Sequence, residues 1–278
     1  MRSERCQDPF ERPSRAAKRR DDDAQFGGGV GPQSACMIAR VLEASARRIS
    51  QRLGSDALVL DVGGGARPFW RADWVIDLAA YDSRGQLGWD GDPRHERFGP
   101  RTWVQRDICD REPWPFSDRQ FDFAVCSHTL EDVRDPIWVA SELGRVARAG
   151  YIEVPALQEE LTYGIQGPWV GWGHHRWLVF AGDDKIEFLF KHHVINRVGS
   201  HSPAGSAERL TPEEKVQTLW WEGRLEARER FMWTAAELDG FLEQMAASAS
   251  PAHRNGLRSS LIRWRRLIRT AREGRSRR

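Results

Sequence analysis

The sequence lacks a long hydrophobic run. No apolar stretch approaches the roughly 20 residues that cross a bilayer, and residues 1–23 are charged throughout, without the apolar centre of a secretory signal. We therefore expect no membrane span and a cytoplasmic location. Cysteine is also scarce: Cys6, Cys36, Cys109 and Cys126 are scattered and show no metal-type spacing. This pattern predicts reduced thiols in a reducing compartment.

A charge of one sign is missing as well. The 42 lysines and arginines nearly balance 40 acids, so the net charge of +2 gives no general reason to expect a nucleic-acid partner. The C-terminal segment is the exception, because residues 254–278 hold ten arginines and one acid, Glu273. We expect a basic helix there, over 255–273, whose apolar stripe packs on the domain or whose arginines contact an anionic partner.

Strand-like and helical patterns alternate in the middle of the chain. Short apolar runs predict strands at 57–62, 73–78, 102–107, 121–126 and 151–155, and helical spacing predicts helices at 33–53 and from 136 to 149. Such alternation indicates an α/β fold with a mostly parallel sheet. Only about ten residues separate the first two strands, which is near the lower limit for a parallel crossover. The helix between them must shrink to a turn or two, or the second strand must begin later.

The pattern changes after residue 155. Residues 177–180 and 185–190 flank a short polar turn and predict an antiparallel hairpin. Residues 196–212 have the composition of a loop, and 213–247 mix helical and strand patterns. We expect four parts: a disordered segment at 1–32, a core at 33–195, a substrate-side insertion or cap at 196–253 and the basic helix at 254–278.

A glycine turn follows the first predicted strand. Asp61 closes that strand, and Gly63, Gly64 and Gly65 come next, where the missing side chains let a ligand approach the backbone. Glycine turns also exist only to turn the chain, so this signal is weak alone. A dinucleotide-binding turn needs a third glycine where this chain has Pro68, which argues against a bound pyrophosphate.

Acids end the next two predicted strands. Asp77 can accept from both hydroxyls of a ribose, and Asp107 can accept from an adenine amino group while Ile108 covers the ring. With Asp61, acids stand at the ends of three successive strands, where an open α/β sheet binds its ligands. The three acids favour an adenosine-type ligand.

The segment that follows carries a family resemblance. Residues 107–110, 114–118 and 120–133, followed by Pro136, Glu142-Leu143, Arg145-Val146 and Gly150-Tyr151, resemble the second half of class I S-adenosylmethionine (SAM)-dependent methyltransferases of the type 11-like kind. The resemblance covers about 34–195 and is strongest at 102–155. It implies a Rossmann-like, mostly parallel sheet with an antiparallel C-terminal hairpin and helical additions. It also implies SAM as the cofactor.

The resemblance also implies site residues. It places the cofactor against residues after the first four strands: Asp61, Gly63, Gly64, Gly65, Asp77, Asp107, Ile108, Ser127 and His128. The enzyme would mainly align the acceptor with an activated methyl group, and an oxygen acceptor would also benefit from a general base. The candidate catalytic residues are His128, Glu153, His174 and His175. Many relatives have a histidine where this chain has Asp132, which weakens the transfer of a base from that position.

Tryptophans and histidines gather at residues 169–177. Trp169, Trp172 and Trp177 could form an aromatic wall for a flat acceptor such as a sugar, or they could pack as core under the hairpin. His174 and His175 could bind a metal with Glu131 or Asp132. Because neighbouring residues on a strand point to opposite faces, we expect no metal site.

Three functions remain open at this point. The first is a small-molecule methyltransferase, acting at oxygen on a sugar or related metabolite. The second is an RNA or protein methyltransferase that uses the 254–278 helix, although the Asn-Pro-Pro-Tyr-type motif of amino-directed nucleic-acid enzymes is missing. The third is a SAM-binding scaffold without catalysis. We expect a small-molecule acceptor, possibly a saccharide, and no nucleic acid, while the oligomeric state is open.

Overall fold

The computed structural model describes residues 41–88, 92–182 and 185–248. Cys6, Cys36, the predicted segment 1–32 and the predicted helix 255–273 lie outside these residues. The helices are α1 (Glu43–Arg52), α2 (Pro136–Val146), α3 (Leu157–Glu160) and α4 (Ala235–Ser248). The strands are β1 (Val59–Val62), β2 (Trp74–Asp77), β3 (Trp103–Gln105), β4 (Phe123–Ser127), β5 (Ala149–Pro155), β6 (Trp177–Ala181), β7 (Lys185–Phe190), β8 (Val216–Glu222) and β9 (Glu226–Glu229).

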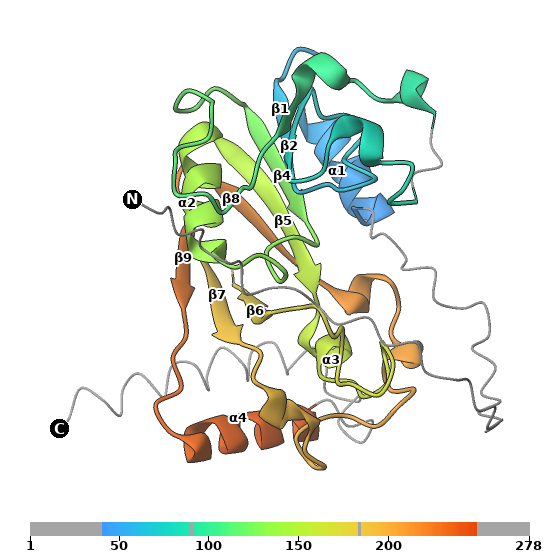
Figure 1. Cartoon of the computed structure of the whole chain (residues 1–278), viewed down its shortest axis with the longest axis vertical. Coiled ribbons are helices and arrows are strands. Elements are labelled where there is room, and N and C mark those ends of the chain that lie inside the picture. Colours follow the sequence, from blue (N-terminus) through green and yellow to red (C-terminus); the bar gives the residue numbers. More distant parts are fainter. Residues whose placement is uncertain (1–40, 89–91, 183–184, 249–278) are drawn as a thin grey trace, which may run out of the picture. The chain divides into compact units, whose positions relative to one another are not determined.

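A six-stranded sheet forms the centre of the fold (Figure 1). Its order is β3-β2-β1-β4-β5-β8, in which the first five strands are parallel and β8 pairs antiparallel with β5. The strand order starts at β1 in the middle of the sheet, runs through β2 and β3 to one edge, and then reverses, with β4 and β5 on the other side of β1. Ligands of open α/β sheets bind at this kind of reversal, beyond the carboxyl ends of the strands. The predicted α/β fold with a mostly parallel Rossmann-like sheet is confirmed.

The antiparallel strand of the central sheet differs from the expectation. The predicted hairpin exists as β6 and β7, but it belongs to a separate sheet of order β6-β7-β9, in which β7 and β9 are parallel. The antiparallel edge is instead β8, from the region expected to form a substrate-side cap. Apolar and polar residues do not alternate along β8, because Trp220 packs on Tyr151 on one face of the sheet while Trp221 is buried on the other.

Alternate residues of the central strands face two different cores. Ile49 of α1 packs on one face, against Val59, Val75, Phe123, Val125 and Tyr151. Apolar residues of α2, β6 and β7 pack on the other face, against Leu60, Val62, Ile76, Ala124, Cys126, Ile152 and Val154. Burial on both faces explains why these strands have continuous apolar runs. Cys109 and Cys126 are buried free thiols, as expected.

The short link between β1 and β2 contains turns and no helix within this described stretch. Two turns are closed by the N–H of Arg67 donating to Gly64 O and the N–H of Ala72 donating to Phe69 O, at 3.0 and 2.8 Å. β2 begins at Trp74, one residue later than predicted. Both expected solutions therefore apply in part, because turns replace the helix and β2 begins one residue later, so no helix follows the glycine turn in this link.

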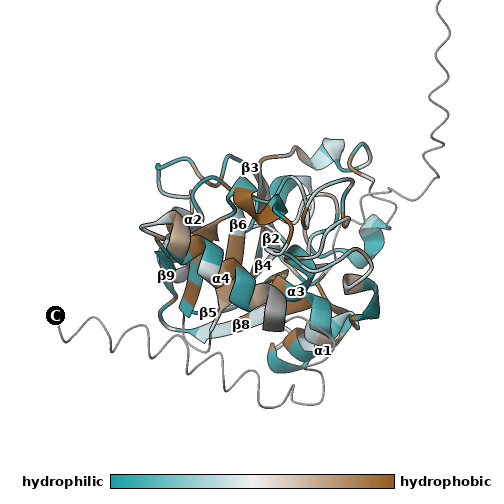
Figure 2. Ribbon diagram, turned by 90° about the horizontal axis from the view of Figure 1, so that it is seen from below, coloured by the Kyte–Doolittle hydropathy of each residue, from teal (hydrophilic) through white to brown (hydrophobic). Residues whose placement is uncertain are grey.

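A third core lies behind the second sheet. It joins β6 and β7 to α4 through Leu178, Phe180, Leu189, Leu242 and Met245. In Figure 2, β6 is largely hydrophobic, whereas α4 alternates hydrophobic and hydrophilic residues along its length. Among the described residues, no helix has the length and apolar character needed to cross a membrane.

Candidate functional site

The glycine turn after β1 is shaped by two left-handed residues. Gly63 and Gly65 have φ angles of 71° and 56°, which L side chains rarely adopt. A Cβ atom on Gly63 would lie 2.3 Å from Cγ2 of Thr129, so this glycine also permits a close approach to the loop after β4. A Cβ atom on Gly65 would meet nothing within 4 Å. The turn is thus packed on one side and open at Gly65.

Two of the predicted acids hold this turn in place. Asp61 accepts from the N–H of Phe69 at 2.8 Å, and its burial raises its pKa to about 7. Asp77 accepts from the N–H of Gly65 at 2.8 Å and from the N–H of Ala79 at 2.7 Å. Burial also raises the pKa of Asp77. Asp77 therefore lies directly beside the open part of the turn, whereas Asp61 lies beneath it.

The third acid lies after β3. Asp107 forms an ion pair of 2.6 Å with Arg134 and accepts from the N–H of Cys109. Burial alone would raise the Asp107 pKa, but these contacts hold it below its usual value. Ile108, expected to cover an adenine ring, is only 6% exposed and packs in the core. The exposed apolar side chain in this region is Leu78, which follows Asp77 and is 68% exposed.

A buried ionic cluster lies at the end of β4. His128 has a φ of 49° and stands between two buried acids, with ring nitrogens 3.5 Å from Glu131 and 3.4 Å from Glu153. Burial alone would lower the pKa of His128, but the two carboxylates raise it to about 10. His128 is therefore an imidazolium at neutral pH, which has no lone pair to accept a proton.

Glu153 is fully occupied by donors. It accepts from Ser127 Oγ at 3.2 Å, from the Tyr151 hydroxyl, and from the N–H of Leu42 at 3.1 and 3.2 Å, where α1 begins. These contacts connect the end of β5 to β4 and α1. This geometry suits a residue that positions its neighbours better than one that takes a proton.

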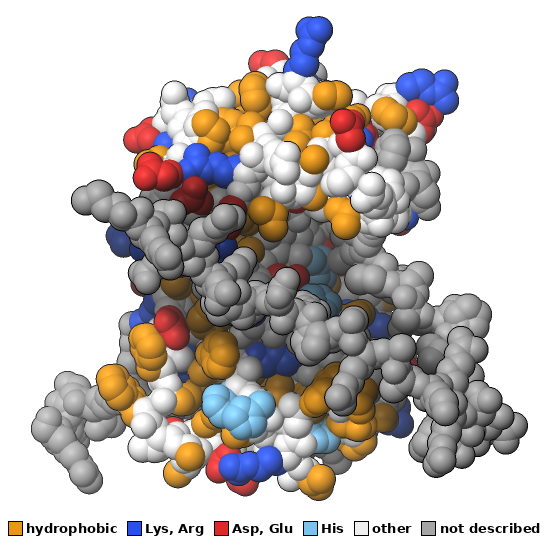
Figure 3. All heavy atoms as spheres, in the orientation of Figure 1, with side chains coloured by type: hydrophobic (Ala, Val, Ile, Leu, Met, Phe, Trp, Pro, Cys, Tyr) orange, Lys and Arg blue, Asp and Glu red, His pale blue; other side chains and the backbone are white. Residues whose placement is uncertain are grey.

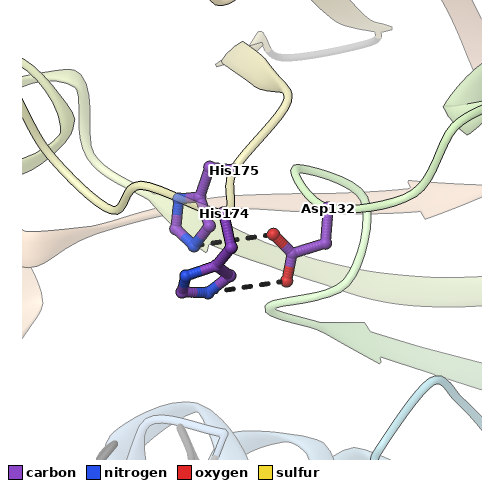
Figure 4. Close-up of side chains that lie close together, drawn as sticks. All are labelled: Asp132, His174 and His175. Carbon is purple, nitrogen blue, oxygen red and sulfur yellow. Dashed lines mark ion pairs between the residues drawn. The ribbon is translucent and has the colours of Figure 1, made fainter. Parts of the chain in front are cut away.

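The histidine pair faces the loop between β4 and α2. Figure 4 shows both rings turned toward the carboxylate of Asp132. Nε2 of His174 lies 4.0 Å from one carboxylate oxygen, and Nε2 of His175 lies 3.8 Å from the other. The strand geometry expected for the two histidines is wrong, because β6 begins only at Trp177 and His174 lies in a turn. The turn lets adjacent side chains converge.

Backbone hydrogen bonds hold this segment on the β4–α2 loop. The carbonyl of Glu131 accepts from the N–H groups of Arg176 and Trp177 at 2.7 and 3.1 Å. Nε1 of Trp177 donates to the carbonyl of Val133 at 2.8 Å. Because Thr129 of the same loop contacts Gly63, one short loop connects the glycine turn to the histidines.

The tryptophans of this segment have different environments. Trp177 packs against Phe188 and Phe190, so it serves the core under the hairpin. Trp169 is 55% exposed, and the ring of Trp172 lies 6.0 Å from that of His175. Trp177 therefore fits the core interpretation, whereas an aromatic wall formed by Trp169 and Trp172 stays a prediction. Figure 3 shows a hollow in this face of the molecule, with histidine and acidic side chains at its depth.

Comparisons with known proteins identify the family. A family model described as a methyltransferase domain matches residues 37–244. The chain belongs to this methyltransferase family. No curated protein matches the chain.

Solved structures give only distant similarity to this methyltransferase. A SAM-dependent methyltransferase from Aquifex aeolicus is 20% identical over 41% of this chain and 65% of its own, with a TM-score of 0.29. One from Mesorhizobium loti is 14% identical over 54% of this chain and 64% of its own, with a TM-score of 0.32. The match spans 50% to 65% of the first solved chains' own length, so the family assignment rests on the family model.

The residues of the turn fit SAM, the cofactor of this class I methyltransferase. Its ribose hydroxyls, amino group and ammonium are donors, and the carboxylates of Asp77 and Asp107 provide acceptors with lone pairs that backbone donors leave free. The open position at Gly65 leaves room for a ligand beside the Asp77 carboxylate. Leu78 offers an apolar surface that Ile108 does not. Sequence reasoning missed Leu78, although an apolar residue directly after a strand-end acid is a usable signal.

Proposed function

We propose that this methyltransferase methylates an oxygen atom of a small polar acceptor, a sugar or a related metabolite. One observation carries the proposal: the loop that contacts the glycine turn through Thr129 also presents Asp132 to His174 and His175. The polar side chains of Asp132, His174 and His175 therefore lie close to the glycine turn. Hydroxyl-rich molecules need such donors and acceptors at fixed positions.

The cofactor side uses the strand ends. When bound, SAM supplies a methyl group already activated by its sulfonium. Asp77 would hold the ribose, Asp107 the adenine edge, and Gly63 and Gly65 the methionine part. Ser127 and His128 border this region at the end of β4, and the positive charge of His128 repels a sulfonium unless Glu131 and Glu153 compensate it. We assign His128 and Glu153 to positioning.

The acceptor side uses the histidine pair. Nδ1 of His175 lies 2.7 Å from Oε2 of Glu160. Burial alone would lower the pKa of His175, but the acids around this residue raise its pKa. His174 differs, because burial and the neighbouring His175 lower its pKa. Its Nδ1 lies 3.1 Å from Oε1 of Gln166, an acceptor, so Nδ1 carries the proton and the lone pair is on Nε2. Of the four predicted catalytic residues, His174 is the one whose Nε2 lone pair is available on the acceptor side of the proposed site.

The test is binding followed by turnover. Titration calorimetry with SAM should show binding to one site per chain, and turnover should release S-adenosylhomocysteine with sugars or sugar nucleotides as acceptors. His174→Ala should retain SAM affinity within about threefold while losing at least tenfold in kcat. Absence of SAM binding at millimolar concentration would refute the cofactor site. Turnover with amines or nucleic acids and none with hydroxylated acceptors would refute the acceptor class.

A further inference from the structure

We propose that Asp132, His174 and His175 bind a divalent transition-metal cation, whose open positions hold two adjacent oxygens of the acceptor. The assignment of the acceptor rests on the proposed function, whereas the metal site stands on its own geometry. It differs from the expectation of no metal, which relied on the two histidines lying on a strand.

The donor atoms have the spacing of an open ligand set. One atom from each residue lies within 4.8 Å of the other two. The two Nε2–carboxylate distances of 4.0 and 3.8 Å are too long for hydrogen bonds. Ligands bonded to a metal at about 2.0–2.2 Å stand roughly 3–3.5 Å apart. The most distant pair of donors, up to 4.8 Å apart, therefore needs to close by roughly 1.3–1.8 Å, which exposed side chains such as His174 can supply.

Second partners orient both imidazoles. Nδ1 of His175 lies 2.7 Å from Glu160 Oε2, and Nδ1 of His174 lies 3.1 Å from Gln166 Oε1. Metal-binding histidines usually donate their other N–H to such a carboxylate or amide oxygen. Glu160 is itself fixed by Lys191, which also donates to the carbonyl of Trp172 at 2.7 Å. The two Nε2 atoms are thus aimed at Asp132 by contacts that leave them available.

The charge around the donors favours a cation. Both carboxylate oxygens of Glu131 and Oδ1 of Asp132 are buried without a hydrogen-bond partner among the described residues. Buried acceptors without partners are costly, and a bound cation would offset that cost. His128 and Lys191 are the nearby cations, but they face Glu131, Glu153 and Glu160. A histidine binds a metal through an unprotonated nitrogen, so any proton on Nε2 of His175 would leave to solvent when the metal binds.

The ligand types indicate which metal. Two imidazoles and one carboxylate with open positions suit Mn²⁺, Fe²⁺, Co²⁺, Ni²⁺ or Zn²⁺, whereas Mg²⁺ and Ca²⁺ prefer oxygen ligands. Three protein ligands leave room for two neighbouring hydroxyl oxygens. A hydroxyl bound to such a cation loses its proton more easily. The proposed acceptor is therefore a molecule with two adjacent oxygens, such as a vicinal diol.

The test measures the metal alone, on full-length protein freed of metal by a chelator and without SAM or acceptor. Co²⁺ should produce visible absorption bands that saturate at one equivalent, and calorimetry with Zn²⁺ should give the same stoichiometry. Mg²⁺ and Ca²⁺ should not compete at millimolar concentration. Asp132→Asn and His174→Ala should each weaken Co²⁺ binding at least tenfold, because each removes one of three ligands.

The other adjacent histidine pair provides a matched control. His192 and His193 have ring centroids 4.2 Å apart, but among the described residues they belong to no group of possible metal ligands. The double variant His192→Ala/His193→Ala should bind Co²⁺ as the wild type does. Circular dichroism without metal should show that all variants are folded.

Two results would overturn the proposal. One is the absence of saturable Co²⁺ and Zn²⁺ binding by the wild type. The other is binding that both Asp132→Asn and His174→Ala retain while the control pair loses it. Calorimetry with SAM on the same samples separates the two proposals, because a chain that binds Co²⁺ but not SAM would refute the proposed function and leave the metal site intact.

Discussion

The charge on a single histidine defines what the end of β4 can do. His128 was predicted both to border the cofactor and to act as a base, yet its two carboxylate partners favour the imidazolium form. An imidazolium balances the buried acids Glu131 and Glu153, whose charges would otherwise be isolated in the interior. The residue therefore organises the site through its charge.

Replacing one of the two carboxylates beside His128 should lower its pKa, so that its titration is easier to follow. Glu153→Gln should lower the pKa of His128 below about 10, because one of the two carboxylates that stabilise the imidazolium is lost. NMR titration of the ring protons measures this pKa directly. Glu131→Gln is the matched control, since it removes the other carboxylate without touching the contact to α1 at Leu42. A wild-type His128 that titrates near 6.5 would contradict the interpretation.

The same ion pairs predict a pH dependence of stability. Because the folded pKa of His128 lies above its unfolded value of about 6.5, folding takes up a proton at intermediate pH. The stabilisation should be complete below pH 6.5 and decline as the pH rises through about 10. Glu153→Gln should flatten this decline in urea unfolding measured from pH 6 to 10.

At the level of elements, the turn after β1 carries the cofactor site. The two glycines of this turn have different neighbours. Thr129 approaches Gly63 so closely that no side chain fits there, while Gly65 borders open space. The two glycines share a left-handed backbone but differ in their surroundings. This difference separates the cost of backbone strain from the cost of a steric clash.

Substituting the two glycines should therefore have unequal effects. Gly65→Ala should cost about 1–2 kcal/mol, the penalty for an L residue in the left-handed region, whereas Gly63→Ala adds a clash with Thr129 and should cost clearly more. Urea unfolding measures both losses. Thr129→Ala should recover part of the loss in a double variant with Gly63→Ala and none of the loss at Gly65. Equal losses in the two single variants would show that packing against Thr129 is unimportant.

The sequence predicts those strands and helices whose residue pattern is visible within the segment itself. β1, β2, β4 and β5 are buried on both faces, and their apolar runs predict them directly. The bounds of β8 were not predicted because Trp220, which is partly buried, and Trp221, which is buried, pack on opposite faces of the sheet, so apolar and polar residues do not alternate there. The convergence of His174 and His175 on Asp132 depends on hydrogen bonds to a loop about 40 residues earlier in the chain, which spacing cannot show.

At the level of the whole molecule, the two sheets are connected by a side chain of β8. Nε2 of Gln217 donates to the carbonyl of Pro155 in β5 at 3.0 Å and to the carbonyl of Val179 in β6 at 2.9 Å. β6 is the strand that follows the histidine segment. The link therefore fixes the acceptor side of the proposed site relative to the central sheet.

Breaking this link should loosen the second sheet. Gln217→Met keeps the length of the side chain but leaves two carbonyls without their donor, so we expect a loss of about 1–3 kcal/mol in urea unfolding. Gln105→Met in β3 is the control, because its single bond to the Leu78 carbonyl is 3.4 Å long and exposed, and its effect should stay within about 0.5 kcal/mol. Hydrogen exchange should accelerate at the amides of β6 and β7 and remain unchanged in β1 and β4. If exchange rose equally in both sheets, the substitution would act on global stability, and Gln217 would not be the connection between them.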